Sequence, residues 1–355
     1  MAPEDPSARR PRLTPPVADV RRAVRSVLAS FPEPVEGSGH IGPSTGSGPA
    51  APLVLVALSG GADSLALAAA TAFEAPRAGL RAGAVVVDHG LQDASAAVAE
   101  SAADAARALG LDPVRVRRVV VTGEGGPEAS ARAARYAALD AAADETGAAL
   151  VLLGHTLDDQ AETVLLGLAR GSGAASLAGM APQSGRYARP LLGIRRAATR
   201  QACLDAGLEP WDDPHNTDPA YTRVRVRDRV LPVLEAELGP GVAEALARTA
   251  EQLREDEQAF TSQIDEFIEE LCEPADTAMP APNPAALRQR IIRHVVASEF
   301  GVSLTRTQTL GVARLVTDWH GQGPIDLPGG IRATRAGSRI VFSTTGSTEV
   351  LPHDH

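Results

Sequence analysis

The chain has 355 residues with 44% apolar content and a net charge of −10, enough to bury one full core and a smaller second one, so two or three domains are expected. Its only cysteines, Cys203 and Cys272, form no CxxC pair, which argues against a cysteine-bound metal or iron–sulfur site and favours a reducing compartment, the cytoplasm. No run approaches the roughly 18 apolar residues needed to span a bilayer, and the amino terminus lacks the apolar core of a secretory signal, so no membrane role is expected.

The first 50 residues are expected to form a mobile extension that contains one helix. Residues 1–16 are rich in proline and charge, and Phe31–Pro52 is rich in glycine, serine and proline. Between them, apolar residues recur at spacings of three and four, at Val17, Val20, Val24, Val27 and Phe31. This spacing predicts an amphipathic helix with one apolar stripe that packs on the domain that follows.

Residues 51–234 alternate between strand-like and helix-like segments. The predicted strands are Leu53–Leu58, Ala82–Val87, Val114–Val121 and Ala149–Leu153, and alanine-rich helical runs separate them. This order is typical of a doubly wound α/β fold, in which helices cover both faces of a parallel sheet. Ligands of such sheets bind at the carboxyl ends of the strands, so the loops after these strands form the candidate site.

The loop after the first predicted strand is the strongest signal for a nucleotide. It runs directly into a helix and consists of Ser59, Gly60, Gly61, Ala62, Asp63 and Ser64. The two glycines let the backbone approach a ligand closely, and the serines and the first helical N–H groups face the same hollow, which favours an anion. The chain contains no lysine, so a GK[ST] phosphate loop is excluded. The alternative is an ordinary tight turn in which Asp63 complements the helix dipole.

Two arginines share one face of the next strong helix former, EASARAARY (128–136). Arg132 and Arg135 are three residues apart and therefore project from the same side. Guanidinium groups suit phosphates, so this pair is a candidate phosphate contact. The alternative is an arginine face that is merely solvated.

A second polar cluster follows the fourth predicted strand. In GHTLDDQAET (154–163), Asp159 and Glu162 are three residues apart on a predicted helix, and His155 lies one turn before Asp159. These side chains are expected to converge at the mouth of the cleft, where two carboxylates suit a cationic substrate. The alternative is that Thr156 caps the helix while the aspartates after it complement the helix dipole.

Two arginine-containing segments follow this cluster. Arg170 is the first residue of an RGSG sequence. One interpretation of the two glycines is that they simply end the preceding helix. Arginines alternate with other residues at Arg223, Arg225, Arg227 and Arg229. Their side chains share one face if this segment is extended and are spread broadly around the axis if it is helical. Contact with phosphates is expected there.

The rest of the chain is predicted to form an acidic linker helix and a small basic α+β domain. Residues 235–276 hold 13 acids against two arginines, and Val242–Leu271 has the apolar spacing of a long helix. Residues 284–343 hold eight arginines against three acids, so a polyanion is expected to dock there, with Arg288 and Arg293 as candidate contacts. The elements predicted in this domain are helices Ala285–Phe300 and Arg306–Trp319 and strands Ile325–Leu327, Ile331–Arg335 and Arg339–Phe342. Residues 344–355 are expected to be disordered.

Five motifs occur in the order in which they occur in one known family. They are SGGADS (59–64), VDHGLQ (87–92), ASARAARY (129–136), GHTLDDQAET (154–163) and RGSG (170–173). On these motifs the chain resembles the tRNA(Ile)-lysidine synthetases of the ATP pyrophosphatase, or PP-loop, superfamily, over roughly residues 50–235. The resemblance implies an adenine nucleotide alpha-hydrolase-like fold.

The resemblance also implies a two-step reaction. With ATP and Mg²⁺, such an enzyme adenylates the wobble cytidine of tRNA(Ile) with a CAU anticodon and releases pyrophosphate. L-lysine then displaces AMP at C2 of the base and leaves lysidine. A homodimer is one alternative for the oligomeric state, which the sequence leaves open.

The roles of individual residues follow from the same resemblance. It assigns ATP to the loop from Ser59 to Ser64 and to Asp88, His89, Arg132 and Arg135. Asp63, His155 and Asp159 are implied as catalytic, Asp63 also as a ligand of Mg²⁺, and Asp159 and Glu162 as lysine-binding. The implied tRNA contacts are Arg170, Arg223, Arg225, Arg227, Arg288 and Arg293. The chain departs from the family pattern at Gln92 and at His215, and a histidine satisfied within a turn is the alternative for His89.

Three other functions compete with this one. Thiolation enzymes of the superfamily also adenylate a pyrimidine oxygen, but they generally use paired cysteines or a cluster, which this chain does not offer. An adenine-nucleotide sensor would need the loop but neither the acidic cluster nor a basic domain. Ammonia-dependent enzymes that activate a carboxylate are not excluded by the sequence.

Overall fold

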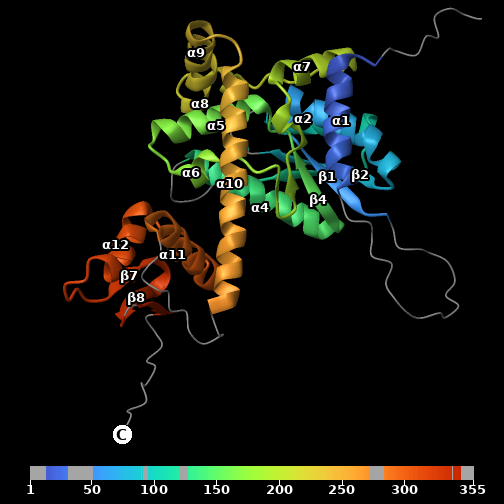
Figure 1. Cartoon of the computed structure of the whole chain (residues 1–355). Coiled ribbons are helices and arrows are strands. Elements are labelled where there is room, and N and C mark those ends of the chain that lie inside the picture. The colour runs from blue at the N-terminus through green and yellow to red at the C-terminus, as the bar shows by residue number, and fades with distance from the viewer. Residues whose placement is uncertain are drawn as a thin grey trace, which may run out of the picture. The chain divides into compact units, whose positions relative to one another are not determined.

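The computed structural model of the chain divides into two compact units, Met1–Arg254 and Glu255–His355 (Figure 1). The structure describes residues 13–30, 51–88, 90, 95–119, 127–271, 284–337 and 339–344. The segments predicted to be mobile, apart from a few residues at their edges, lie outside these ranges, as do His89 and Gln92. No helix within the described ranges is both long and apolar enough to cross a membrane.

The first unit is built on one six-stranded sheet with the order β3-β2-β1-β4-β6-β5. The four predicted strands are present and parallel, as β1 (Leu53–Leu58), β2 (Arg81–Asp88), β3 (Val114–Arg118) and β4 (Ala148–Leu153). Strand β6 (Tyr187–Ala188) continues the parallel sheet, and β5 (Gln183–Ser184) pairs with it in the antiparallel sense. The sequence did not predict β5 and β6 because two-residue strands are too short to show a period.

Helices cover both faces of this sheet. Alternate residues of β1 point to opposite sides, so Val54 and Val56 join one core while Leu53 and Leu55 join another. The first core includes residues of α1 (Pro15–Ala29), α2 (Ala62–Glu74), α3 (Ser95–Ala108) and α7 (Arg196–Asp205). The second core includes residues of α4 (Pro127–Thr146). The predicted doubly wound fold is therefore confirmed (Figure 1).

Helix α1 is the amphipathic helix that the sequence predicted. It contacts α2 and α7 and buries Val20, Val24 and Leu28. Its Arg25 donates two hydrogen bonds, of 2.8 and 2.9 Å, to the buried carboxylate of Glu74 on α2. The helix ends at Ala29, so Phe31 of the predicted stripe lies outside the described residues.

The last part of the first unit is helical and packs against helix α5 (Leu157–Ala169). Its elements are α6 (Ala174–Leu177), α8 (Thr222–Arg225), a π-helical turn η4 (Val226–Val230), α9 (Leu231–Leu238) and the first part of α10 (Val242–Leu271). Leu157 and Ala161 of α5 share a buried cluster with Val226 and Leu231. This packing brings the arginine-rich segment 223–229 to α5.

The second unit begins within α10 and contains a three-stranded antiparallel sheet. Its elements are α11 (Ala285–Phe300), α12 (Arg306–Thr317), β7 (Ile325–Leu327), β8 (Ile331–Ala336) and β9 (Arg339–Thr344). Ile291, Val312, Ile331 and Ile340 belong to its buried core. Helix α12 ends two residues before its predicted end, β8 ends one residue after its predicted end, and β9 ends two residues after its predicted end.

Candidate active site

The loop between β1 and α2 forms a hollow that opens toward the first turn of α2. Gly60 has a φ of +83°, a conformation that favours glycine. The Ser64 hydroxyl accepts the Ser59 N–H at 3.2 Å and donates to the Gly61 carbonyl at 3.0 Å, which closes the loop on itself. Gly61 caps α2 without a side chain, so the first N–H groups of the helix are left for an anion.

A second loop lies directly against this one because Gly154 carries no side chain. A Cβ atom at Gly154 would stand 3.2 Å from the backbone nitrogen of Ser64. Any larger residue would push the loop after β4 away from the loop after β1. Gly154 thus brings His155 and the start of α5 next to the start of α2.

Helix α5 begins with a capping box that also orients an acid toward the site. The Thr156 N–H donates to Asp159 Oδ2 at 2.8 Å, and the Thr156 hydroxyl accepts the Asp159 N–H. The alternative in which Thr156 caps the helix is therefore present. The cap engages only Oδ2 of Asp159, because Asp159 Oδ1 accepts a hydrogen bond from a guanidinium instead.

Arg196 joins the acids of the two loops. Its Nη2 donates to Asp159 Oδ1 at 2.6 Å, and its Nη1 donates to Glu162 Oε1 at 3.3 Å. Its Nε lies 3.5 Å from Asp63 Oδ2. Asp63 also accepts a hydrogen bond from the hydroxyl of buried Thr199, one turn further along α7. Neither Arg196 nor Thr199 belongs to a motif that the sequence indicated.

Glu162 lies behind Asp159 and is fully buried. Arg227 holds it in a bidentate pair, with Nε at 2.7 Å from Oε1 and Nη2 at 3.2 Å from Oε2. Asp159 lines the larger of two cavities at this edge of the sheet, whereas Glu162 does not. A ligand would reach Glu162 only after Arg196 or Arg227 had moved.

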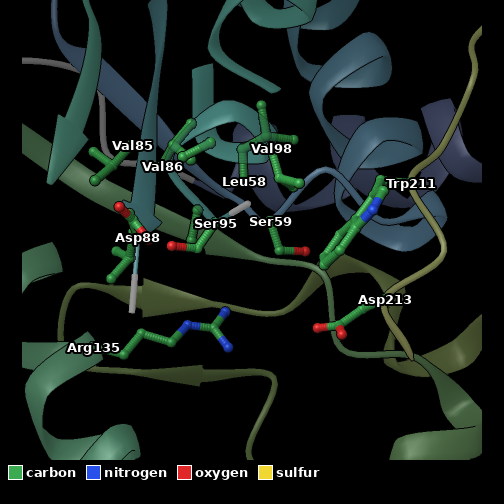
Figure 2. A pocket seen from close by; sticks show the side chains of 13 residues that line it. Leu58, Ser59, Val85, Val86, Asp88, Ser95, Val98, Arg135, Trp211 and Asp213 are labelled. Carbon is green, nitrogen blue, oxygen red and sulfur yellow. The ribbon is translucent and has the colours of Figure 1, made fainter. Parts of the chain in front are cut away.

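Two cavities occupy the carboxyl ends of the strands. The larger, about 340 Å³, is lined by the loop from Gly61 to Ser64 and by His155, Asp159 and Arg196. The smaller, about 180 Å³, is lined by apolar residues of β1, β2 and α3 and by Asp88 and Asp213 (Figure 2). Both cavities are lined by Ala57, Ser59, Arg135 and Trp211, so they adjoin each other.

Among the residues that the structure describes, none forms an ion pair with Arg135. Figure 2 shows its guanidinium in the smaller cavity, across from Leu58 and Val86. It makes no hydrogen bond or ion pair with any residue in the described ranges, and burial lowers its pKa. A half-buried guanidinium that faces a cavity is suited to a phosphate.

His155 is neutral in this setting. Burial lowers the pKa of the ring to about 4, and the nearby guanidinium of Arg135 acts in the same direction, although the Asp159 carboxylate opposes both. Its Nδ1 is buried and has no hydrogen-bond partner within the described part of the chain. The ring therefore offers an acceptor and adds no positive charge to the cavity.

Comparison with known proteins identifies the family. A model described as PP-loop domain matches residues 45–234. A tRNA(Ile)-lysidine synthase from Leifsonia xyli is 63% identical over 90% of this chain and 98% of its own length. The one from Thermobifida fusca is 52% identical over 93% of this chain and 98% of its own length. The one from Streptomyces coelicolor is 55% identical over 83% of this chain and 86% of its own length. The chain belongs to the tRNA(Ile)-lysidine synthase family.

A solved structure supports the PP-loop fold of this family. The U34-tRNA thiolase NcsA from Methanococcus maripaludis, with its [4Fe-4S] cluster, has a TM-score of 0.53 and 20% identity. The likeness covers 68% of this chain and 80% of the thiolase. At this identity it shows the shared fold alone.

The structure separates the two arginines of the ASARAARY motif in this lysidine synthase family member. Arg135 reaches both cavities, whereas Arg132 is exposed and its guanidinium lies over the ring of Tyr136, 4.9 Å from the centroid. Asp88 lines the smaller cavity and accepts the N–H of Gly90 at 2.9 Å. The ATP role of Arg132 and Asp88 stays a prediction, and that of His89 falls outside the described residues.

The segments expected to contact tRNA are placed in different surroundings. Residues 222–230 are helical, so the extended alternative is wrong and the four arginines diverge. Arg227 pairs with Glu162, Arg225 donates to the carbonyls of Pro219 and Ala220, and Arg223 lies 3.5 Å from the Thr163 hydroxyl. The tRNA role of these side chains stays a prediction.

Arg170 follows α5, whose end is a glycine stop. Gly171 has a φ of +66°, and the Ser172 N–H returns to the carbonyl of Gly167 at 3.0 Å. The simple helix stop is therefore present, and the exposed side chain of Arg170 keeps its tRNA role as a prediction. In the second unit, Arg288 and Arg293 are half-buried on α11, and the side chain of His215 lies outside the described residues.

Trp211 is a further site residue that no sequence motif indicated. Its backbone N–H donates to the Gly60 carbonyl at 3.0 Å. Trp211 lines both cavities, and Figure 2 shows its side chain at the smaller one. The connection from α7 thus holds the glycine loop from outside. No local pattern could have revealed this contact, because it joins residues about 150 positions apart in the sequence.

Proposed function

We infer that the protein is an ATP-dependent ligase that forms lysidine at the wobble cytidine of tRNA(Ile) with a CAU anticodon. The observation that carries the proposal is the larger cavity, which joins an anion site to a cation site. The glycine loop and Arg135 stand on the anion side, and Asp159 stands on the cation side. ATP and lysine carry these opposite charges, and the family relatives are named for this product.

In the first step ATP binds with its adenosine in the smaller cavity and its phosphates at the loop. The cytosine O2 forms a bond to the α phosphorus while the bond from that phosphorus to the bridging oxygen breaks. The N–H groups at the start of α2 take up the charge of the departing pyrophosphate, and Arg135 balances the charge of the α phosphate.

Mg²⁺ fits this site as a partner of the phosphates. Among the described residues, no group of three histidine, cysteine, aspartate or glutamate side chains could hold a metal by itself. Mg²⁺ is commonly bound by one or two carboxylates together with substrate phosphates, and Asp63 is the carboxylate of the loop. The ion would neutralise charge on the leaving pyrophosphate.

In the second step the side-chain amine of lysine forms a bond to C2 of the base. The bond between C2 and O2 breaks, and AMP leaves with that oxygen. Asp159 lines the cavity, so its carboxylate holds the lysine ammonium and takes the proton that the ammonium must lose before attack. Neutral His155 avoids repelling that cation.

This function is tested by an incubation of the protein with radiolabelled lysine, ATP, Mg²⁺ and a tRNA(Ile) transcript that has a CAU anticodon. Label that survives mild alkali is expected, because it sits on a base and not on an ester. A transcript with uridine at the wobble position is the control. AMP without stable label would mean another nucleophile, and no AMP would favour a nucleotide-binding module.

We expect substitution of Glu162 to act on lysine and to spare the first step. In Glu162→Gln the pairing with Arg227 and Arg196 weakens, so these guanidiniums shift toward Asp159. The lysine KM is expected to rise about tenfold or more, while adenylation of tRNA without lysine changes less than about threefold. Glu251→Gln, on the exposed face of α10, is the control. A normal lysine KM in Glu162→Gln would contradict the role of this residue.

The second unit supplies the proposed tRNA surface. Reversing the charge of Arg288 and Arg293 to glutamate is expected to weaken tRNA binding and to reduce the slope of log K against log salt by about two, because each phosphate contact releases about one counter-ion. The same change at Arg22 and Arg107 of the first unit is the control. An unchanged slope would refute these two contacts.

The site of action and the oligomeric state are further proposals. We expect the protein to act in the cytoplasm, where tRNA and ATP meet, and a homodimer is one state to test by light scattering.

A further inference from the structure

Among the residues that the structure describes, Arg196 is the one that contacts acids in both the ATP half and the lysine half of the site. Asp63 belongs to the helix after β1, on the ATP side, and Asp159 and Glu162 belong to the helix after β4, on the lysine side. A guanidinium spreads five N–H groups over a planar fork, so each of its three nitrogens can face a different carboxylate, whereas an ammonium offers all its N–H groups from one nitrogen. One side chain from a third helix, α7, therefore bridges the two halves.

Each of the three acids keeps another partner if Arg196 leaves. Asp63 accepts from the Thr199 hydroxyl, Asp159 Oδ2 accepts from Thr156, and Glu162 is held by Arg227. Arg227, in contrast, is fixed by two hydrogen bonds to a fully buried carboxylate. Arg196 is thus the member of the cluster that can change partner without dismantling it.

The same guanidinium faces the place expected for phosphates. Arg196 is partly exposed and lines the larger cavity together with Gly61, Asp63 and Ser64. Although burial opposes it, the surrounding carboxylates raise the pKa of Arg196, so it remains a cation. A polyphosphate in the loop would compete with Asp159 for this cation.

We propose that Arg196 is a positioning residue that withholds Asp159 from lysine until ATP binds. Before ATP binds, Arg196 Nη2 holds Asp159 Oδ1 at 2.6 Å, whereas Arg227 Nη2 lies 3.8 Å from the same oxygen. When phosphates draw the guanidinium toward the loop, Asp159 Oδ1 becomes available to the lysine ammonium. ATP and lysine therefore bind with positive coupling, and by linkage each raises the affinity of the other by the same factor. This inference rests on the proposed function of the site.

Calorimetry of the full chain tests the coupling without catalysis. Lysine is titrated into the protein and Mg²⁺ with and without saturating α,β-methylene ATP, which is not cleaved at the α phosphate. In the wild type the analogue is expected to lower the lysine Kd about fivefold or more, the lower end of typical couplings. The reciprocal titration, analogue with and without lysine, should give the same factor.

Substitution of Arg196 should remove the coupling. In Arg196→Gln, lysine is expected to bind without the analogue about as tightly as it binds the wild type with it, and the analogue should change its Kd less than about twofold. Arg196→Lys keeps one charge but spans fewer acids, so part of the coupling should return. Arg195→Gln is the matched control, because Arg195 pairs with Asp158 and Glu244 outside the cavity.

Several results would overturn the inference. One is a wild-type lysine Kd that is the same with and without the analogue. Another is lysine binding that stays undetectable when the analogue is present. The third is a coupling that persists in Arg196→Gln. If the wild type forms lysidine and one of these results is obtained, the role of Arg196 fails alone. If no alkali-stable label forms on tRNA(Ile), the proposed function fails first.

Discussion

Asp63→Asn is expected to reduce tRNA-dependent AMP formation by about 10³-fold. Asp63 lies in the first turn of α2 and is the carboxylate of the glycine loop, where the pyrophosphate and Mg²⁺ would be held. The asparagine has the same shape and can still accept the Thr199 hydroxyl, so the loop should keep its fold. The loss is then one of charge and not of packing.

Quantifying labelled AMP from α-labelled ATP, with tRNA(Ile) and without lysine, isolates this first step. Melting temperatures of the variant and the wild type are compared in parallel to confirm that the fold is intact. Asp104→Asn, at an exposed position of α3, is the matched control. AMP formation within about threefold of the wild type would remove Asp63 from the reaction.

Arg135→Met is expected to lower the rate of adenylation by about 100-fold or more while leaving the free energy of unfolding unchanged or higher. The adenylation rate falls without a loss of stability because Arg135 makes no hydrogen bond or ion pair with the described residues. Burial lowers the pKa of this side chain. Its removal costs no polar contact with the described part of the fold, and methionine keeps the volume of the stem. ATP, however, loses the one arginine among the described residues that lines both cavities.

Urea unfolding and single-turnover adenylation measured on the same preparation check this combination. Arg107→Met, which removes exposed ion pairs with Glu100 and Asp104, serves as the control for loss of an arginine elsewhere. The ATP role of Arg135 would be untenable if the variant adenylated tRNA normally. A large loss of stability would instead show that Arg135 holds the fold together.

The local sequence was sufficient to locate the two loops of the site. A run of buried β residues followed by glycines and a helix places SGGADS at the carboxyl end of β1, and the same logic places GHTLDDQAET at the end of β4. In a parallel sheet these ends lie on one edge, so the loops had to meet if β1 and β4 were close. The strands are in fact neighbours.

The sequence by itself determined the doubly wound fold, the places of its four main strands and of the elements of the second unit, and the two loops, because these depend on periodicity and on turn residues close together in the chain. Only the tertiary structure decided which charges meet. It turned Arg135 but not Arg132 into the cavity, paired Arg227 with Glu162, and set Arg196 between Asp63 and Asp159. Partners this far apart in sequence leave no local pattern, since the packing of α5, α7 and η4 around the strand ends is what brings them together.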